Sequence, residues 1–345
     1  MKHLVPLCTL LFLSFSLLAQ YEKVYQIPLP EKFDGLSQEV TIKSSPNPNL
    51  PAFVEGQTDL LIWKHSTTIT ATADMKVVEA GAYLLNYGTW KLRVAFKPKE
   101  IKEKFRCSSL QLKAGESITF PDNDRYGSFT ETGWNFWYVI AENADGKKIF
   151  GYEILETTGK MSDGTQVLPL LTSKSQLNWT GKAGDSDYSL SGTLRASSGK
   201  LQIQEGQLRG GALEVNMESL QHENNSVAKH LKDDDFFAVK SHPKASFTIQ
   251  SVEALEAGKY RITGEMTMKG ITQTESFEVQ LTEGEKQYQL NGTLILDRTE
   301  YDVLYGSTKA PGSGYSIADE FSLEVELVFR KDYPGSKSWN SVEKR

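Results

Sequence analysis

Histidine is a common metal ligand, and its ordinary pKa also lets it exchange protons near neutral pH. The 345 residues include five histidines, and His222, His230 and His242 lie near the acidic run Asp233 to Asp235. No two of these histidines have the four-residue spacing of a zinc-binding helix, and no cysteine lies in this half of the chain. We therefore expect no metal site and no cofactor.

Nucleophilic catalysis is the second chemistry that the residues could support. A serine hydrolase of the common type presents its nucleophile on a Gly-x-Ser-x-Gly turn. No such turn occurs after residue 19, and Gly312-Ser313-Gly314 lacks the spacing. We therefore expect a protein that is not an enzyme. The formal net charge of −6 also argues against a nucleic-acid partner, because phosphate backbones attract basic surfaces.

The N-terminus has the pattern of a secretory signal peptide. A positively charged start at Lys2 precedes an apolar run from Leu4 to Ala19. A membrane anchor is the competing interpretation, but the run is short for a bilayer span, contains Pro6, and has no basic stop after it. We expect residues 1–19 to be removed and the mature protein to be exported.

Most of the remaining chain has the alternation of apolar and polar residues that is typical of half-buried strands. The sequence therefore predicts an all-β protein. In the N-terminal half, Asp145-Gly146 is a turn sequence that predicts a hairpin within Trp134 to Tyr152. Only Ser226 to Lys232 has a helical pattern, with Asn225 or Ser226 as the N-cap residue.

A polar stretch at residues 157–164 predicts a domain boundary. We expect residues 20–160 to form a β-sandwich-like domain of unassigned family, which could bind a protein partner. Residues 165–330 are expected to close into an antiparallel barrel, because a closed barrel has no exposed edge, and residues 331–345 to form a polar tail. A barrel of about eight strands is either filled by side chains or holds one small ligand.

One segment of the C-terminal half carries a family signature. Asp235, Phe236 and Phe237 are followed by Pro243, Ala245 and Phe247. Together with the sequences at 210–217, 264–270 and 296–299, this order resembles the YceI-like family over residues 173–330. Members of that family are lipocalin-like antiparallel barrels associated with binding polyisoprenoid chains in the bacterial periplasm. The resemblance implies that this barrel holds an isoprenoid-like chain, in the periplasm or at the cell surface of a bacterium.

Several apolar side chains are candidates for the lining of such a barrel. Phe236 and Phe237 could contact a ligand or could anchor their loop to the core, because aromatic side chains bury large areas in either role. Met266 and Met268 lie on one strand face, where a flexible thioether suits either a core or a pocket. The full set of candidates is Phe236, Phe237, Phe247, Met266, Met268 and Tyr301.

Arg298 is the candidate for a polar contact. It could pair inside the fold with Asp297 or another carboxylate, since an arginine inside a barrel must be paired. Alternatively, its guanidinium could bind the phosphate of a ligand head group. The sequence thus predicts an exported lipid-binding protein, and the alternative is a non-catalytic interaction or structural module of the cell envelope whose barrel is filled by side chains.

Overall fold

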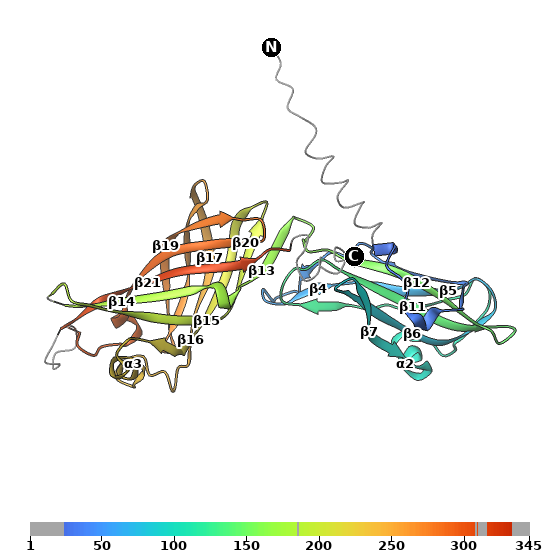
Figure 1. Cartoon of the computed structure of the whole chain (residues 1–345), viewed down its shortest axis with the longest axis horizontal. Helices are drawn as coiled ribbons and strands as arrows, with labels where there is room; N and C mark the ends of the chain where they lie inside the picture. The colour runs from blue at the N-terminus through green and yellow to red at the C-terminus, as the bar shows by residue number, and fades with distance from the viewer. Residues whose placement is uncertain (1–23, 185, 308, 310–315, 333–345) are drawn as a thin grey trace, which may run out of the picture. The chain divides into compact units, whose positions relative to one another are not determined.

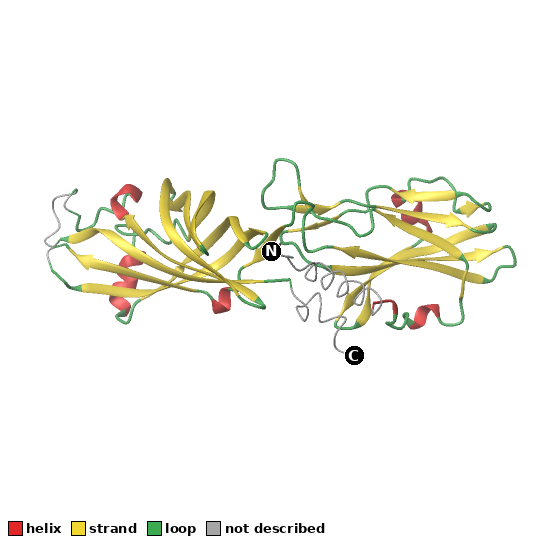
Figure 2. Cartoon of the chain, turned by 90° about the horizontal axis from the view of Figure 1, so that it is seen from above, coloured by secondary structure: helices red, strands yellow, loops and turns green. Residues whose placement is uncertain are grey.

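Strands make up most of the fold, which confirms the all-β prediction (Figure 1, Figure 2). The computed structural model describes residues 24–332 except 185, 308 and 310–315. The predicted signal peptide and most of the predicted tail lie outside these residues. The described residues divide into two compact units: residues 24–162 with Asp332, which we call the N-terminal unit, and Asp163–Lys331, which we call the C-terminal unit. Among the described residues, no helix is long and apolar enough to cross a membrane.

Three sheets form the N-terminal unit. The largest has the order β1 (Ser37–Gln38), β12 (Lys148–Thr157), β11 (Gly133–Asn143), β6 (Met75–Asn86) and β7 (Thr89–Phe96), with β8 (Gln111–Leu112) also paired to β6. The second consists of β2 (Val40–Ser45), β5 (Ser66–Ala71) and β9 (Ser117–Phe120), and the third of β3 (Ala52–Phe53), β4 (Leu61–Trp63) and β10 (Arg125–Gly127). The short helices are η1 (Glu31–Phe33) and α2 (Pro98–Lys104).

The large sheet is buried on both faces, which explains why residues 136–141 of β11 form an uninterrupted apolar and aromatic run. Trp137 and Val139 belong to a core shared with β2 and β5, whereas Phe136 and Tyr138 belong to a second core that includes Phe33. Strands β11 and β12 pair antiparallel through a turn in which Gly146 has a φ of 74°. This confirms the predicted hairpin, because that turn needs a residue that tolerates positive φ.

Eight consecutive strands of the C-terminal unit form a closed antiparallel barrel, as the alternation predicts. They are β14 (Gln176–Ala183), β15 (Ser189–Gln204), β16 (Gln207–Gln221), β17 (Lys244–Glu256), β18 (Lys259–Met268), β19 (Ile271–Glu283), β20 (Gln287–Asp297) and β21 (Ile317–Arg330). Each strand pairs with the next, and β21 pairs with β14 to close the ring. β13 (Thr165–Pro169) adds to β15. The 3-10 helices are η2 (Thr172–Lys174) and η3 (Arg298–Tyr301).

One α-helix, α3 (Asn225–Lys232), connects β16 to β17 and lies at one end of the barrel (Figure 1). Its position confirms the predicted helix, but the predicted N-cap residue is wrong. The helix begins one residue earlier, and the side-chain oxygen of Asn224 accepts a hydrogen bond from the backbone N–H of Ser226 at 2.9 Å. Asn224 therefore satisfies a free backbone donor in the first turn, as an N-cap residue does.

Candidate ligand-binding cavity

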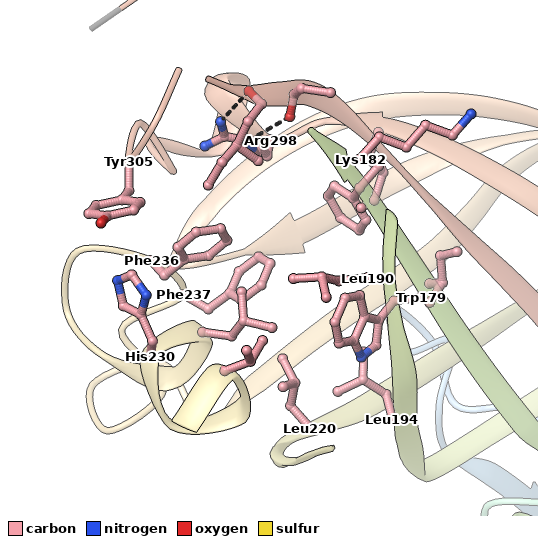
Figure 3. A pocket seen from close by; sticks show the side chains of 18 of the residues that line it. Trp179, Lys182, Leu190, Leu194, Leu220, His230, Phe236, Phe237, Arg298 and Tyr305 are labelled. Carbon is pink, nitrogen blue, oxygen red and sulfur yellow. Dashed lines mark hydrogen bonds between the residues drawn. The ribbon is translucent and has the colours of Figure 1, made fainter. Parts of the chain in front are cut away.

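A cavity of about 530 Å³ occupies the end of the barrel next to α3 (Figure 3), and we call it the main cavity. This volume lies within the roughly 300–1,000 Å³ that is usual for small-molecule sites. Most of the lining is apolar and comes from the strands, from α3 and from the loops beside it. The apolar and aromatic side chains are Trp179, Ala183, Tyr188, Leu190, Leu194, Val215, Met217, Leu220, Val227, Leu231, Phe236, Phe237, Ala245, Met266, Met268, Leu296, Tyr305, Ile317, Ala318, Phe321 and Leu323.

The loop after α3 places two aromatic rings in the cavity wall. The carbonyl of Asp233 accepts hydrogen bonds from the N–H groups of Phe236 and Ala238, each at 3.0 Å, so the acidic run forms a tight turn. Phe236 and Phe237 then meet edge to face, with ring centroids 5.2 Å apart. Both rings lie opposite Leu190 in Figure 3. The turn thus holds two large apolar side chains against the cavity.

Arg298 lies at the edge of the main cavity but directs its guanidinium at the protein. Nε donates to the carbonyl of Ala318 at 3.0 Å, Nη1 to Val303 at 2.6 Å and Nη2 to Ile317 at 3.0 Å. The carboxylate of Asp319 is 3.7 Å from Nη2. Burial lowers the pKa of Arg298, although the neighbouring Asp319 opposes this shift. An arginine remains charged despite such a shift, and here backbone carbonyls, more than a carboxylate, compensate the buried charge.

The other two basic side chains of the lining also do not present an unpaired charge to its interior. His230 Nε2 lies 3.1 Å from a carboxylate oxygen of Asp235. Lys182 contributes its aliphatic stem, and its amine points away from the aromatic cluster in Figure 3. The interior of the main cavity is therefore suited to an apolar molecule without a buried charge.

The structure brings together five of the seven predicted site residues. Phe236, Phe237, Met266, Met268 and Arg298 all line the main cavity. The other two lie elsewhere.

Phe247 lines a second cavity of about 50 Å³ deeper in the barrel, where its ring centroid is 5.5 Å from that of Phe277. Tyr301 belongs to the buried core of the barrel but lines neither of these two cavities. It is fully buried in η3 and donates a hydrogen bond from its hydroxyl to Glu275 at 2.7 Å. The 3-10 turn directs Tyr301 to this carboxylate, which strand alternation could not show.

The sequence interpretation missed several lining residues that carried a signal. Trp179, Leu190 and Leu194 come from β14 and β15, whose alternation could have indicated an inward face. Val227 and Leu231 are four residues apart on α3 and so share one face of the helix. Tyr305 lies in a loop, and its sequence context carries no such signal. Among the described residues, no group of three or more His, Cys, Asp or Glu side chains could hold a metal ion.

The geometry is that of a lipocalin-like antiparallel barrel with an apolar cavity at one end. Residues 169–329, which span this barrel, match the family model of the YceI-like domain. The C-terminal half of the chain is therefore a YceI-like domain, as the sequence motifs indicated.

Individual relatives and solved structures are each similar to part of the chain. A UPF0312 protein of Staphylococcus aureus strain USA300 is 25% identical over 118 residues, which cover 32% of this chain and 66% of that protein, just under two thirds of its length. The crystal structure of Burkholderia cenocepacia BcnA has 19% identity and a TM-score of 0.41, and covers 46% of this chain and 98% of BcnA. A polyisoprenoid binding domain from Saccharophagus degradans, implicated in plant cell wall breakdown, has 12% identity and a TM-score of 0.35 over 47% of this chain and 97% of that domain.

Proposed function

We propose that the C-terminal unit binds one long, uncharged apolar molecule inside its barrel, with an isoprenoid-like chain as the most suitable ligand class. The main cavity of about 530 Å³, with its apolar lining, is the observation that carries this proposal. A core that served only to stabilise the barrel would be packed to the density of other protein interiors, with few voids larger than a water molecule. A cavity of this size at one end of the barrel is suited to a bound ligand.

Burial of the chain alone supplies enough free energy for useful affinity. At about 0.8 kcal/mol per buried methylene, one five-carbon isoprene unit contributes up to ~4 kcal/mol before ordering costs. Two or three such units would reach the micromolar range after several kcal/mol are lost to ordering. Recognition of a head group is therefore not required, and the length and shape of the chain should govern affinity.

The polar groups of the lining favour an uncharged ligand. The guanidinium of Arg298 uses all three of its nitrogens on backbone carbonyls. Three of its five N–H groups are thus committed, and a phosphate at this edge of the cavity would have only the remaining two, with the carboxylate of Asp319 lying 3.7 Å from Nη2. A neutral alcohol or a hydrocarbon imposes no such cost. We therefore expect the ligand to carry no charge at the end that enters the barrel.

The test is native mass spectrometry of gently purified full-length protein, followed by solvent extraction of anything bound. We expect a mass increment of one molecule per chain and recovery of a long-chain apolar compound. Delipidated protein should also take up farnesol at one molecule per chain. If neither the purified nor the reloaded protein carries such a molecule, the proposal is wrong, and the non-catalytic interaction or structural module becomes the better interpretation.

We further propose that the protein acts outside the cytoplasm, in the periplasm or at the cell surface. The support is the charged start followed by the apolar run from Leu4 to Ala19. Sequencing the N-terminus of the exported protein from its native host should give Gln20 as the first residue. Recovery of an intact Met1-Lys2 start in that fraction would show that the leader is not cleaved.

A further inference from the structure

The main cavity and the smaller second cavity are separated by a partition of three side chains. Val215 of β16, Met266 of β18 and Leu323 of β21 line both cavities. All three are buried, with exposed fractions of 6%, 6% and 7%. Because they come from three separate strands of the barrel, they reach its interior from different sides, and a chain entering beside α3 would meet them before the second cavity.

Beyond this partition lies the small second cavity. The second cavity measures about 50 Å³, and its walls include the packed rings of Phe247 and Phe277. The main cavity has roughly ten times this volume. The tail of a bound chain would therefore end at the partition unless the partition moved.

Two seams of the ring, β16–β17 and β19–β20, pair over only five residues each. Strands β16 and β17 pair only from Ala212 with Thr248 to Asn216 with Lys244. Gly211 and Ile249, which line the second cavity, lie just beyond the last pair. Since fewer backbone hydrogen bonds hold this part together, it can widen at lower cost than the fully paired wall.

Met266 is the most adjustable member of the partition. Its unbranched thioether side chain has more rotatable bonds than valine or leucine. In the register of the sheet it is paired with Phe247, which lines the second cavity. Met268 lies two residues further along the same strand and on the same face. It lines the main cavity but not the second cavity. The two methionines thus differ in whether they close off the second cavity.

We propose that Met266, together with Val215 and Leu323, sets the length of the apolar chain that the barrel accepts. This inference rests on the proposed function and adds to it the residue that determines chain-length specificity. Shortening Met266 should join the two cavities and allow a longer tail to extend past the partition. Shortening Met268 should enlarge the main cavity without joining it to the second.

The experiment is a competition among isoprenoid alcohols of increasing length, from geraniol through farnesol and geranylgeraniol to solanesol. Delipidated full-length protein is equilibrated with an equimolar mixture, separated from free alcohol and extracted, and the bound alcohols are quantified. We expect the parent protein to show a cut-off in length. We compare the bound amount of the first alcohol that the parent excludes with the bound amount of the longest alcohol that it accepts. This ratio should rise about tenfold in Met266→Ala and change by less than about threefold in Met268→Ala.

Val215→Ala opens the same partition from a different strand, β16, and is expected to shift the ratio in the same direction. It keeps the test decisive if Met266→Ala does not fold. An unchanged ratio in the folded partition variants, or an equal shift in Met268→Ala, would overturn the partition as the determinant of length. If the parent protein captures no alcohol at all, the proposed function itself fails, and the partition proposal fails with it.

Discussion

The guanidinium of Arg298 lies over the ring of Phe236, 5.7 Å from the ring centroid. The same group donates hydrogen bonds to the carbonyls of Val303, Ile317 and Ala318. Phe236 forms part of the wall of the main cavity. One buried cation thus connects the loop after η3, the start of β21 and an aromatic wall residue, and a cation–π contact of this kind adds to the hydrogen bonds.

Replacing Arg298 by lysine should destabilise the C-terminal unit without changing head-group selectivity. A lysine keeps the charge but cannot donate in three directions from a planar group, so we expect a loss of about 2–4 kcal/mol. The measurement is scanning calorimetry of the full chain, with the transition of the N-terminal unit as the internal reference. Affinities for farnesol and farnesyl phosphate should change by the same factor, whereas a selective loss for the phosphate would assign Arg298 to head-group binding.

Introducing a charge at Met268 should strongly weaken binding of an apolar chain. Met268→Glu places an unpaired carboxylate in the lining of the main cavity. We expect farnesol to bind at least tenfold more weakly and the C-terminal unit to lose about 2–4 kcal/mol of stability. Met268→Leu conserves volume and polarity, so it should cost less than about 1.5 kcal/mol and keep binding. Equal affinity of the Glu variant and the parent would exclude this face of β18 from the site.

The cap of α3 should affect the rate of ligand release. Asn224→Ala removes the hydrogen bond to the Ser226 N–H, which should cost about 1 kcal/mol of helix stability. Since α3 carries Val227 and Leu231 of the cavity lining, we expect faster dissociation of bound farnesol in a stopped-flow displacement experiment. Asn225→Ala is the control at the neighbouring position, and similar release rates from the two variants would show that the cap does not control access.

The stability of the N-terminal unit should fall as the pH drops below about 6.5. His65 is buried, and this burial lowers its pKa from the ordinary value of 6.5, although the Trp63 backbone and the charge of Asp124 oppose the shift. Below pH 6.5 the unfolded chain therefore binds a proton that the folded unit does not. The stability present above this pH is lost as the pH falls toward the lower folded-state pKa, by up to about 1.4 kcal/mol per pKa unit.

Calorimetry between about pH 7.5 and pH 5 checks this expectation. In His65→Leu, the transition of the N-terminal unit should lose most of its dependence on pH over this window. His230→Leu changes a histidine of the other unit and serves as the control. The expectation is wrong if the melting temperature of this unit in the parent protein does not change between these pH values. An equal change in the parent and in His65→Leu would assign the acid sensitivity to other groups.

The sequence by itself determined the architecture of the C-terminal unit and most of the candidate site. Alternation with period two requires that one face of each strand be buried, so it indicated which residues point inward, including Met266 and Met268. The hairpin around Gly146 and the helix α3 followed from equally local rules of turn chemistry and periodicity. The order of motifs around Phe236 and Phe237 indicated the family over residues 173–330, which the match at residues 169–329 confirms.

Only the tertiary structure decided what the inward side chains do. The alternation is the same for a filled barrel and for an open one, because it specifies a face and not the volume left between faces. Tyr301 lines neither cavity, and its hydroxyl in the 3-10 turn donates to Glu275 instead. Arg298 donates to backbone carbonyls of residues up to 20 positions away. Every residue has a backbone carbonyl, so the sequence cannot indicate which ones accept. The main cavity, its partition and the hydrogen-bond acceptors of Arg298 depend on contacts between segments distant in sequence, which local patterns do not encode.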